Sequence, residues 1–470
     1  MGVSIYSHGG VGEVTGSKHF LKTDASTVMI DCGAFQGKRQ IADAKNREWD
    51  FSPEGLSAVV LSHAHYDHSG LLPLLSKKRY NGNIYATGAT RDLAQIILMD
   101  SAKIQAQDEE FLRKQAKKRG EVFNWKPLYE EQDVIRAVEQ FVAISYERPI
   151  RISRDIELAF YDAGHILGSA LSVFSVEQDS KHPLTVVFSG DLGRKGKPII
   201  KDPVQTPDPD YLVLESTYGN RLHEPSGEVL EKLASAVNDT VSRGGKLIIP
   251  AFAIERTQDI VFYLHLLVDA KSIPEIPIYV DSPMATNATT IYKIHPECYD
   301  AETHEAFIKH HKNPFGFNAL RYIEGVDESK ALNDMKEPMI IISSSGMCEA
   351  GRIQHHLLHN LSGEKNTVLI VGFMAKDTLG RQILEGKKTV RIFGDPVPVR
   401  AEIRQIDALS AHADYEEAWE YVSKMDLDKL KGIYLVHGEP DALTAFKGFL
   451  EGKGIKKVEI VEAGKEYPLV

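Results

Sequence analysis

The sequence predicts an α/β protein in which a second domain is inserted into the first, and three observations lead to this prediction. Up to about residue 90, short β-branched strands are separated by glycine-rich turns. From about Tyr211, apolar strands alternate with helical segments, which is typical of a mostly parallel sheet covered by helices. After about Ile392 short elements return, so the chain is expected to re-enter its first domain.

The elements of the first domain follow from apolar runs and charge patterns. The runs VMIDCGAF and LSAVVLSH predict strands that end in polar residues, and more strands are expected in RISRDIELAF, LSVFSVE and LTVVFSGD. A helix is predicted from about Thr90 to Arg119, because acidic residues precede basic ones along it, as the helix dipole favours. We interpret its basic end as a solvated face in preference to a nucleic-acid contact.

The inserted domain repeats a strand, a polar loop and a helix. Its strands are expected in YLVLE, KLIIP, PIYV, MIIISSS and TVLIVG. Ligands of such sheets bind beyond the carboxyl ends of the strands, so the polar loops are expected to gather on one side. The first domain is expected to comprise residues 1–207 and 395–470, and the insertion residues 208–394.

The composition is that of an ordinary globular protein, with 43% hydrophobic and 26% charged residues among 470. The sequence has no recognisable signal peptide and no apolar run of about 18 residues, so a cytoplasmic protein without a membrane partner is expected. Cys32, Cys298 and Cys348 lie far apart, which argues against disulfides and cysteine-bound zinc. The net charge of −11 disfavours a broadly basic surface, so any charge that meets a phosphate backbone must be confined to a groove.

The strongest local signal is LSHAHYDHSG, in which His63, His65, Asp67 and His68 directly follow an apolar strand. Zinc prefers imidazole and carboxylate ligands. His63 and His65 are two residues apart and can share a face, while the next turn can aim Asp67 and His68 at a second ion. Two ions about 3.5–4 Å apart are usual for phosphodiester hydrolysis. A satisfied polar loop is the alternative, but these residues are costly to pack without a metal.

Two more ligands are expected at the ends of distant strands. His165 lies in YDAGHILGSA after the strand IELAFYD, and Asp191 lies in VVFSGDLG after the strand LTVVFS. The adjacent glycines let the backbone approach closely. Alone, either residue would more often belong to a turn than to a metal site. Beside the first cluster, we interpret both as ligands.

The order Asp31, His63-x-His65-x-Asp67-His68, His165 and Asp191 resembles the metallo-β-lactamase superfamily. Later segments resemble its β-CASP branch, which includes ribonuclease J and the endonuclease subunit of the pre-mRNA cleavage and polyadenylation factor. These segments are ESTYG with Glu215, LSAHAD with His412, LVHGE with His437, and DSPM, SSSGM and GFMAKDTLGR. The resemblance covers essentially the whole chain. It implies an αββα sandwich with an inserted α/β domain, the β-CASP domain.

The resemblance also implies a role for each residue of the pattern. One zinc ion would be held by His63, His65 and His165. A second would be held by Asp67, His68 and His437. Asp191 would bridge the two ions, and Asp31 would orient the histidine cluster. His412 would protonate the leaving oxygen or bind the scissile phosphate, and Glu215 would orient His412.

The function that the resemblance implies is a ribonuclease with two zinc ions per chain. The ions would lower the pKa of a bridging water from 15.7 toward about 7 and stabilise the charged transition state. A histidine proton donor is worth about 10²–10⁴ in rate. Single-stranded RNA is the expected substrate, with little sequence preference, because grooves for single strands use local charge and stacking. Internal cleavage is the expected mode of cutting. Without the resemblance, Glu215 and Asp31 could equally be ordinary strand-end carboxylates.

Loops of the inserted domain supply the candidates for RNA contact. They are Ser343, Ser344, Ser345, Gly346, Arg256 and Lys376. Backbone N–H groups between a strand and a helix can hold a phosphate, although a plain helix cap explains SSSG equally well. A second histidine group, His355, His356 and His359, lies on one predicted helix, and we interpret it as packed or solvated.

Other functions stay open. A 5′-exonuclease or a DNA nuclease would use the same fold, because the chemistry does not need a 2′-hydroxyl. A small-molecule metallohydrolase of the thioesterase or lactonase type would explain the metals but not the insertion, Glu215 or His412. A non-catalytic scaffold should have lost metal ligands, and every expected one is present. Assembly as a homodimer is also left open.

Overall fold

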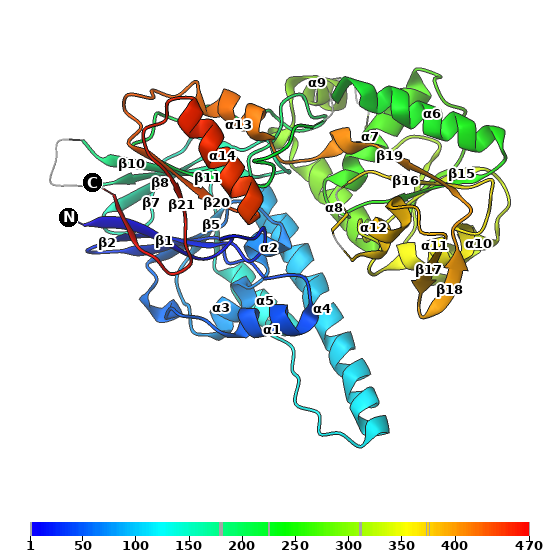
Figure 1. The fold of residues 1–470 in the computed structure, drawn as a ribbon, viewed down its shortest axis with the longest axis horizontal. Coiled ribbons are helices and arrows are strands. Elements are labelled where there is room, and N and C mark those ends of the chain that lie inside the picture. Colours follow the sequence, from blue (N-terminus) through cyan, green and yellow to red (C-terminus); the bar gives the residue numbers. More distant parts are fainter. Residues whose placement is uncertain are drawn as a thin grey trace. The chain divides into compact units, whose positions relative to one another are not determined.

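The structure is a computed structural model that describes residues 2–177, 182–223, 226–309, 313–372, 374–375 and 377–469. The chain forms two compact units (Figure 1). Unit 1 comprises Met1–Lys195, Lys201–Leu222 and Ala411–Val470. Unit 2 comprises Gly196–Ile200 and His223–Ser410.

Unit 1 contains two seven-stranded sheets. The first has the order β22-β1-β2-β3-β4-β5-β6. Its strands are β1 (Val3–Gly9), β2 (Lys18–Thr23), β3 (Thr27–Ile30), β4 (Ala58–Val60), β5 (Ile84–Ala86), β6 (Phe141–Ala143) and β22 (Tyr467–Leu469). Strands β3 to β6 are parallel, so their carboxyl ends meet at one edge, and the histidine cluster follows β4 there.

The second sheet of unit 1 has the order β21-β20-β11-β10-β9-β8-β7. Its strands are β7 (Ile150–Arg151), β8 (Ile156–Asp162), β9 (Ala170–Val176), β10 (Leu184–Phe188), β11 (Tyr211–Glu215), β20 (Gly432–Val436) and β21 (Val458–Ile460). Strands β10, β11 and β20 are parallel neighbours. Their carboxyl ends therefore also lie together, and each leads into a polar residue of the predicted site.

The two sheets of unit 1 pack face to face. Leu21 and Val60 of the first sheet share one buried core with Phe174 and Val186 of the second. A second core covers the outer face of the second sheet, under α13 (Tyr415–Val422) and α14 (Pro440–Gly452). The remaining helices of unit 1 are α1 (Arg39–Arg47), α2 (Tyr66–Ser69), α3 (Leu72–Lys77), α4 (Gly88–Arg119) and α5 (Glu131–Glu139). The predicted αββα sandwich is confirmed.

Helix α4 matches the helix predicted from about Thr90 to Arg119. It begins at a cap in which the Thr87 side chain accepts a hydrogen bond from the Thr90 N–H, and it ends at Gly120, which has φ of 68°. Its first half is packed, whereas the second half projects from the body of unit 1 (Figure 1). None of the described helices combines the length and apolar character needed to cross a lipid bilayer.

Unit 2 is built on a six-stranded sheet in the order β14-β13-β15-β12-β16-β19. Its strands are β12 (Lys246–Pro250), β13 (Ile278–Val280), β14 (Leu320–Tyr322), β15 (Met339–Ser343), β16 (Thr367–Ile370) and β19 (Glu402–Gln405). Each neighbouring pair in this order is parallel, so the predicted mostly parallel sheet is confirmed. A hairpin of β17 (Thr389–Ile392) and β18 (Asp395–Pro398) stands apart from this sheet.

Helices separate the strands of unit 2. They are α6 (Val229–Ser242), α7 (Arg256–Asp269), α8 (Pro283–Ile294), α9 (Ala301–His304), α10 (Val326–Asp334), α11 (Arg352–Asn360) and α12 (Leu379–Leu384). The chain changes units later than the domain boundaries at 207/208 and 394/395 expected from the pattern. Strand pairing explains the difference, because β11 belongs to the second sheet of unit 1 and β19 pairs with β16 in unit 2.

Asp162, the last residue of β8, gives a prediction about stability. Burial raises the pKa of its carboxyl from 3.8 to about 7, and the N–H of Gly164, 3.0 Å from Oδ1, offsets part of this rise. Because the folded-state pKa is raised, its contribution to stability is full below about pH 4 and is lost as pH rises through about 7. Asp162→Asn keeps an acceptor but cannot ionise.

We therefore expect Asp162→Asn to raise the melting temperature at about pH 8 by more than at about pH 5. The free energy of unfolding should change by roughly 1–3 kcal/mol at the higher pH. Thermal unfolding of both proteins at both pH values measures this difference. Equal shifts at the two pH values would contradict the ionisation argument.

Candidate metal centre

The side chains of the predicted pattern meet in unit 1, beyond the ends of strands from both sheets. Six strands lead into a predicted site residue at their carboxyl ends. They are β3 with Asp31, β4 with His63, β8 with His165, β10 with Asp191, β11 with Glu215 and β20 with His437. His412 precedes α13 and forms an isolated bridge with Gly193, which holds it beside the loop of Asp191. Residues far apart in the sequence thus converge because their strands are neighbours.

The first group consists of His63, His65, His165 and Asp191. His63 Nε2 lies 3.1 Å from His65 Nδ1, which lies 3.2 Å from His165 Nε2. Asp191 Oδ2 lies 3.5 Å from His63 Nε2 and 3.6 Å from His165 Nε2. One ligand atom from each of the four residues lies within 4.8 Å of the others. This donor set is suited to one cation.

The second group consists of Asp67, His68 and His437. His68 Nε2 lies 3.3 Å from His437 Nε2, which lies 3.7 Å from Asp67 Oδ2. Asp191 Oδ1 faces this group, at 3.3 Å from His68 Nε2 and 3.4 Å from His437 Nδ1. The two oxygens of Asp191 therefore face different groups. Among the described residues, the buried Oδ1 has no hydrogen-bond donor, which leaves its lone pairs for a cation.

Burial and neighbouring charges make this centre attractive to positive charge. Burial lowers the pKa of His63 well below its usual value, and the other histidines lower it further. An unprotonated imidazole is the form that binds a cation. Burial also lowers the pKa of His68, but Asp191 and Asp31 outweigh it and raise that pKa to about 10. The carboxylates thus stabilise a positive charge inside the protein, whether a proton or a metal ion supplies it.

Asp31 contacts His68 of the second group and fixes the orientation of its ring. It is buried and has φ of 63°, a left-handed conformation that is strained for a residue with a side chain. Its carboxylate accepts hydrogen bonds from the Ser62 N–H at 2.8 Å and the Ser62 hydroxyl at 2.9 Å. His68 Nδ1 lies 2.7 Å from Asp31 Oδ2 and donates to it, which fixes the ring with Nε2 toward Asp191.

A third group joins Asp191 to Glu215 and His412. His412 Nδ1 donates to Glu215 Oε1 at 2.9 Å and lies 3.8 Å from Asp191 Oδ2. Burial lowers the pKa of His412, but Glu215 and Asp191 outweigh it and raise that pKa to about 9. The side chain of His412 is 20% exposed, whereas that of Glu215 is 4% exposed. His412 can therefore meet a ligand while Glu215 stays beneath it.

Two residues of this centre were not singled out by the sequence patterns. Ser62 bridges Asp31 and His63, with its hydroxyl 3.0 Å from His63 Nδ1. Thr217 donates its hydroxyl to Glu215 Oε2 at 2.5 Å and lies 3.1 Å from His437 Nδ1. Both lie inside the recognised motifs, in LSHAH and ESTYG. Ser62 directly precedes His63, and Thr217 lies two residues after Glu215, so closeness to a predicted site residue could have pointed to both.

The serine loop of unit 2 does not form the expected helix N-terminus. Helix α11 begins only at Arg352, six residues after Gly346. The hydroxyl of Ser343 is buried and donates to the Asp281 carbonyl at 2.8 Å. Ser344 donates to the Ser282 hydroxyl at 3.1 Å. The Ser345 hydroxyl accepts two backbone N–H groups of its own loop, so these side chains shape the loop itself.

The other candidates for RNA contact are also accounted for. Arg256 is the first residue of α7 and is 5% exposed, with Nη2 3.1 Å from Glu255 Oε2, so it lies inside unit 2. Lys376 lies outside the described residues. His356 is fully buried, with Nε2 2.6 Å from Asp281 Oδ2. His355 and His359 are exposed, so this helix carries one packed histidine and two solvated ones.

Family models match the chain in three places. The metallo-β-lactamase superfamily matches residues 12–250, the β-CASP domain matches residues 257–383, and a zinc-dependent metallo-hydrolase RNA specificity domain matches residues 396–461. The chain belongs to the β-CASP branch of the metallo-β-lactamase superfamily. It is therefore a hydrolytic enzyme by family. The fold implies a divalent metal ion, and the donor sets around Asp191 fit one.

Three individual relatives are similar to this chain over most of its length. A ribonuclease of Thermus thermophilus is 36% identical over 469 residues, which are 99% of this chain and 100% of that protein. Transcription termination factor FttA of Methanosarcina mazei is 31% identical over 94% of this chain and 67% of its own length. An RNase J-like protein of Methanocaldococcus jannaschii is 31% identical over 92% of this chain and 91% of its own.

A solved structure shares the fold. A protein of unknown function from Enterococcus faecalis V583 superimposes with a TM-score of 0.58 at 12% identity, and the alignment covers all of both chains. At this identity the likeness concerns the architecture alone.

Proposed function

We propose that this chain is a zinc-dependent ribonuclease that cuts single-stranded RNA internally and binds two zinc ions. The observation that carries the proposal is the position of Asp191 between two donor sets, with Oδ2 toward His63 and His165 and Oδ1 toward His68 and His437. One carboxylate shared in this way is suited to two adjacent cations. Imidazole and carboxylate donors are suited to zinc.

Each part of the centre has a role in this proposal. His63, His65 and His165 would hold one zinc ion, Asp67, His68 and His437 would hold the other, and Asp191 would be shared between them. Bound zinc ions would supply a water of lowered pKa and neutralise charge on the phosphate. Asp31 orients His68, and Thr217 orients both His437 and Glu215. These contacts hold the donor atoms in place before a substrate arrives.

His412 acts on the substrate side of the centre. Because its Nδ1 donates to Glu215, a proton given to a phosphate or to the leaving oxygen would come from Nε2. Glu215 accepts N–H groups from Leu192 and Thr217 and thereby holds the imidazole in one orientation. We propose that His412 donates a proton to the leaving oxygen and that Glu215 positions it.

RNA as the substrate draws support from the relatives. The Thermus thermophilus relative is named a ribonuclease and matches this chain from end to end. The alternatives are 5′-exonuclease activity and DNA cleavage in the same centre. A small-molecule hydrolase is disfavoured, because the chain also matches the β-CASP domain and the RNA specificity domain. Cys32 and Cys348, which are buried and form no disulfide, favour a reducing cytoplasm as the place of action, and the homodimer stays a prediction.

The test is to incubate purified protein with RNA labelled at either end, with and without a chelator. We expect internal products from both labels, loss of cleavage in the chelator, and recovery when zinc is added. Products that shorten only from the 5′ end would favour the exonuclease. A His65→Ala variant should be inactive, and cleavage by this variant would show that a contaminating nuclease or another site is responsible.

A further inference from the structure

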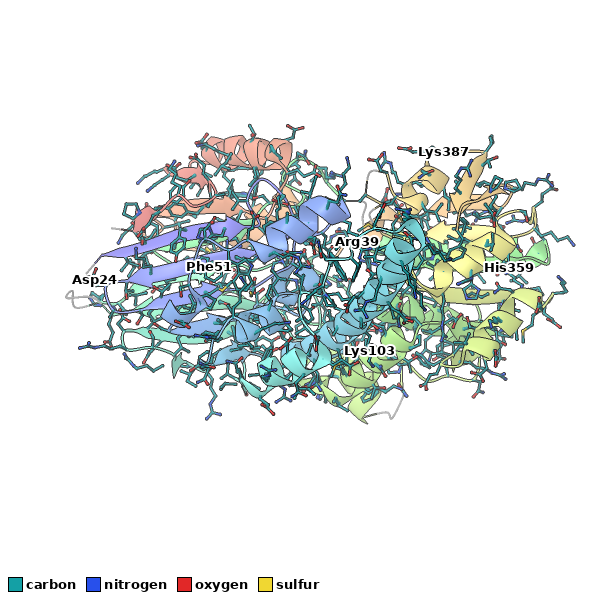
Figure 2. The ribbon with its side chains drawn as sticks, turned by 90° about the horizontal axis from the view of Figure 1, so that it is seen from below. Asp24, Arg39, Phe51, Lys103, His359 and Lys387 are labelled. Atoms are coloured by element: carbon teal, nitrogen blue, oxygen red, sulfur yellow. The ribbon has the colours of Figure 1, made fainter. Side chains whose placement is uncertain are left out.

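A second feature of unit 1 combines basic and aromatic side chains on its surface, outside the metal centre. It is formed by Trp49, Lys78, Arg39, Arg47, Trp125 and Arg113, and we call it the cation–aromatic surface. Helix α1, the end of α3, the second half of α4 and the segment after α4 contribute to it. Arg39 and Asp108 form an ion pair of 3.2 Å that joins α1 to α4, which lie together in Figure 2.

Cations stack on aromatic rings along this surface. Lys78 Nζ lies 4.9 Å from the centre of the Trp49 ring, and the guanidinium of Arg39 lies 5.0 Å from that of Trp125. Arg47 lies 5.9 Å from the same Trp125 ring, and Lys78 Nζ lies 3.5 Å from the Arg47 carbonyl. The pairs are therefore continuous from α3 to the segment after α4.

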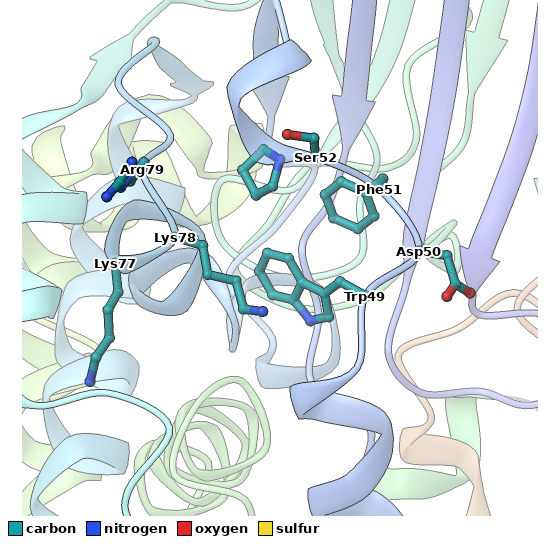
Figure 3. A pocket seen from close by; sticks show the side chains of 8 residues that line it. Trp49, Asp50, Phe51, Ser52, Lys77, Lys78 and Arg79 are labelled. Carbon is teal, nitrogen blue, oxygen red and sulfur yellow. The ribbon is translucent and has the colours of Figure 1, made fainter.

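An open pocket marks one end of the surface. Its volume is about 630 Å³, and it is lined by the stacked rings of Trp49 and Phe51, by Asp50, and by three consecutive cations, Lys77, Lys78 and Arg79. Lys77 and Arg79 form ion pairs with Asp133 and Glu54, so Lys78 is the cation that faces the ring. Figure 3 shows Lys78 reaching toward the indole of Trp49. A flat aromatic ring beside several cations is the arrangement that holds a nucleobase and its phosphates in single-strand grooves.

The other end of the surface is the projecting end of α4. Residues 111–120 contain five basic residues and no acidic one, in a chain of net charge −11. Arg113 and Lys114 pair with glutamates one turn earlier. Within the part of the chain that the structure describes, Lys117, Lys118 and Arg119 form no ion pair. Their charge is available to a polyanion.

Helix α4 connects this end to the metal centre. Its Ser101 hydroxyl donates to the Tyr66 hydroxyl at 3.0 Å, and Tyr66 lies between His65 and Asp67. From Ser101 to Lys118 a continuous helix spans about 25 Å. Stacked single-stranded RNA covers that length with about seven nucleotides, at roughly 3.4 Å each.

We propose that the cation–aromatic surface binds the single-stranded RNA that flanks the cleaved bond. This inference rests on the proposed function. Phosphates would contact the end of α4 and Lys78, and a base would stack on Trp49 once the Lys78 ammonium moves from the ring to a phosphate. RNA that is too short to leave the metal centre would not use the surface.

The test compares Lys117→Glu/Lys118→Glu, Trp49→Ala and a matched control, Lys387→Glu/Lys388→Glu, two exposed adjacent lysines of unit 2. Fluorescence anisotropy in the presence of a chelator measures the binding of labelled RNAs of about 20 and about four nucleotides. For the longer RNA we expect Kd to rise about tenfold in the first two variants. The slope of log Kd against log salt should fall by about 1.4 in the lysine variant.

The control and the shorter RNA separate the outcomes. The Lys387/Lys388 variant should bind like the wild type, and the zinc-loaded variants should cut the four-nucleotide RNA at the wild-type rate. Unchanged binding of the longer RNA, or equal loss in the control, would overturn the proposal. If the wild type binds long RNA through this surface but cuts none, the surface stands and the ribonuclease proposal fails.

Discussion

Replacing Asp191 with alanine is expected to lower RNA cleavage by at least about 10⁴-fold, which corresponds to about 5 kcal/mol of transition-state stabilisation. Its two oxygens face both donor sets, so neither set is complete without it. The variant would keep four histidines buried close together without the carboxylate that lies between them. They are His63, His165, His68 and His437. Removing a bridging ligand should therefore release metal as well as activity.

The amount of bound metal tests this prediction more directly than the rate of cleavage does. We expect the wild type to hold two zinc ions per chain and Asp191→Ala to hold one or none, by elemental analysis or native mass spectrometry. Asp327→Ala removes an aspartate whose side chain is fully exposed, and it should leave metal content and cleavage unchanged. Wild-type metal content together with wild-type activity in Asp191→Ala would remove the basis of the proposed centre.

Local patterns predicted the parts of this molecule whose partners lie close in the sequence. The histidine cluster occupies six residues after one strand, so its convergence on one point follows from a single turn. Helix α4 was predictable because its length, its charge order and the glycine at its end agree. In both cases the structure of the segment depends mainly on the segment itself.

Features that depend on distant partners were not predictable in the same way. The Ser343 hydroxyl bonds to a carbonyl 62 residues away, so the sequence around SSSG could not reveal that it is occupied. Arg256 has its acidic partners Glu255 and Asp259 close in the sequence, but its burial depends on the packing of unit 2 around α7 and not on the local pattern. Strand β19 is short and only half-buried, so its membership of unit 2 follows from pairing with β16 and not from its own pattern.

The same distinction applies to the roles within the centre. From local patterns alone, Asp31 and Glu215 could have been ordinary strand-end carboxylates. The family resemblance implied their orienting roles, and the structure joins Asp31 to His68 and Glu215 to His412. Both carboxylates fix the proton position of a histidine ring. They do so for different purposes, because His68 is buried among the proposed metal ligands whereas His412 is partly exposed. Replacement of His68 should therefore reduce metal binding, whereas replacement of His412 should reduce the rate of cleavage.

Replacing His412 with alanine is expected to lower RNA cleavage about 10²–10⁴-fold while both zinc ions remain bound. His412 Nδ1 lies 3.8 Å from Asp191 Oδ2, and neither the donor set that contains His63 nor the one that contains His68 includes His412. Loss of rate without loss of metal would separate it from the ligands. The same metal analysis used for Asp191→Ala, combined with steady-state kinetics, measures both quantities.

The leaving group then identifies the role of His412. An RNA alkoxide needs a proton as it departs, whereas p-nitrophenolate is stable as an anion and does not. If His412 donates that proton, the His412→Ala defect should shrink to less than about tenfold on bis(p-nitrophenyl) phosphate. An equally large defect on both substrates would contradict proton donation and favour phosphate binding, because a bound phosphate is common to both. Glu215→Gln should show the same dependence on the leaving group with a smaller loss, since it acts only through the orientation of the imidazole.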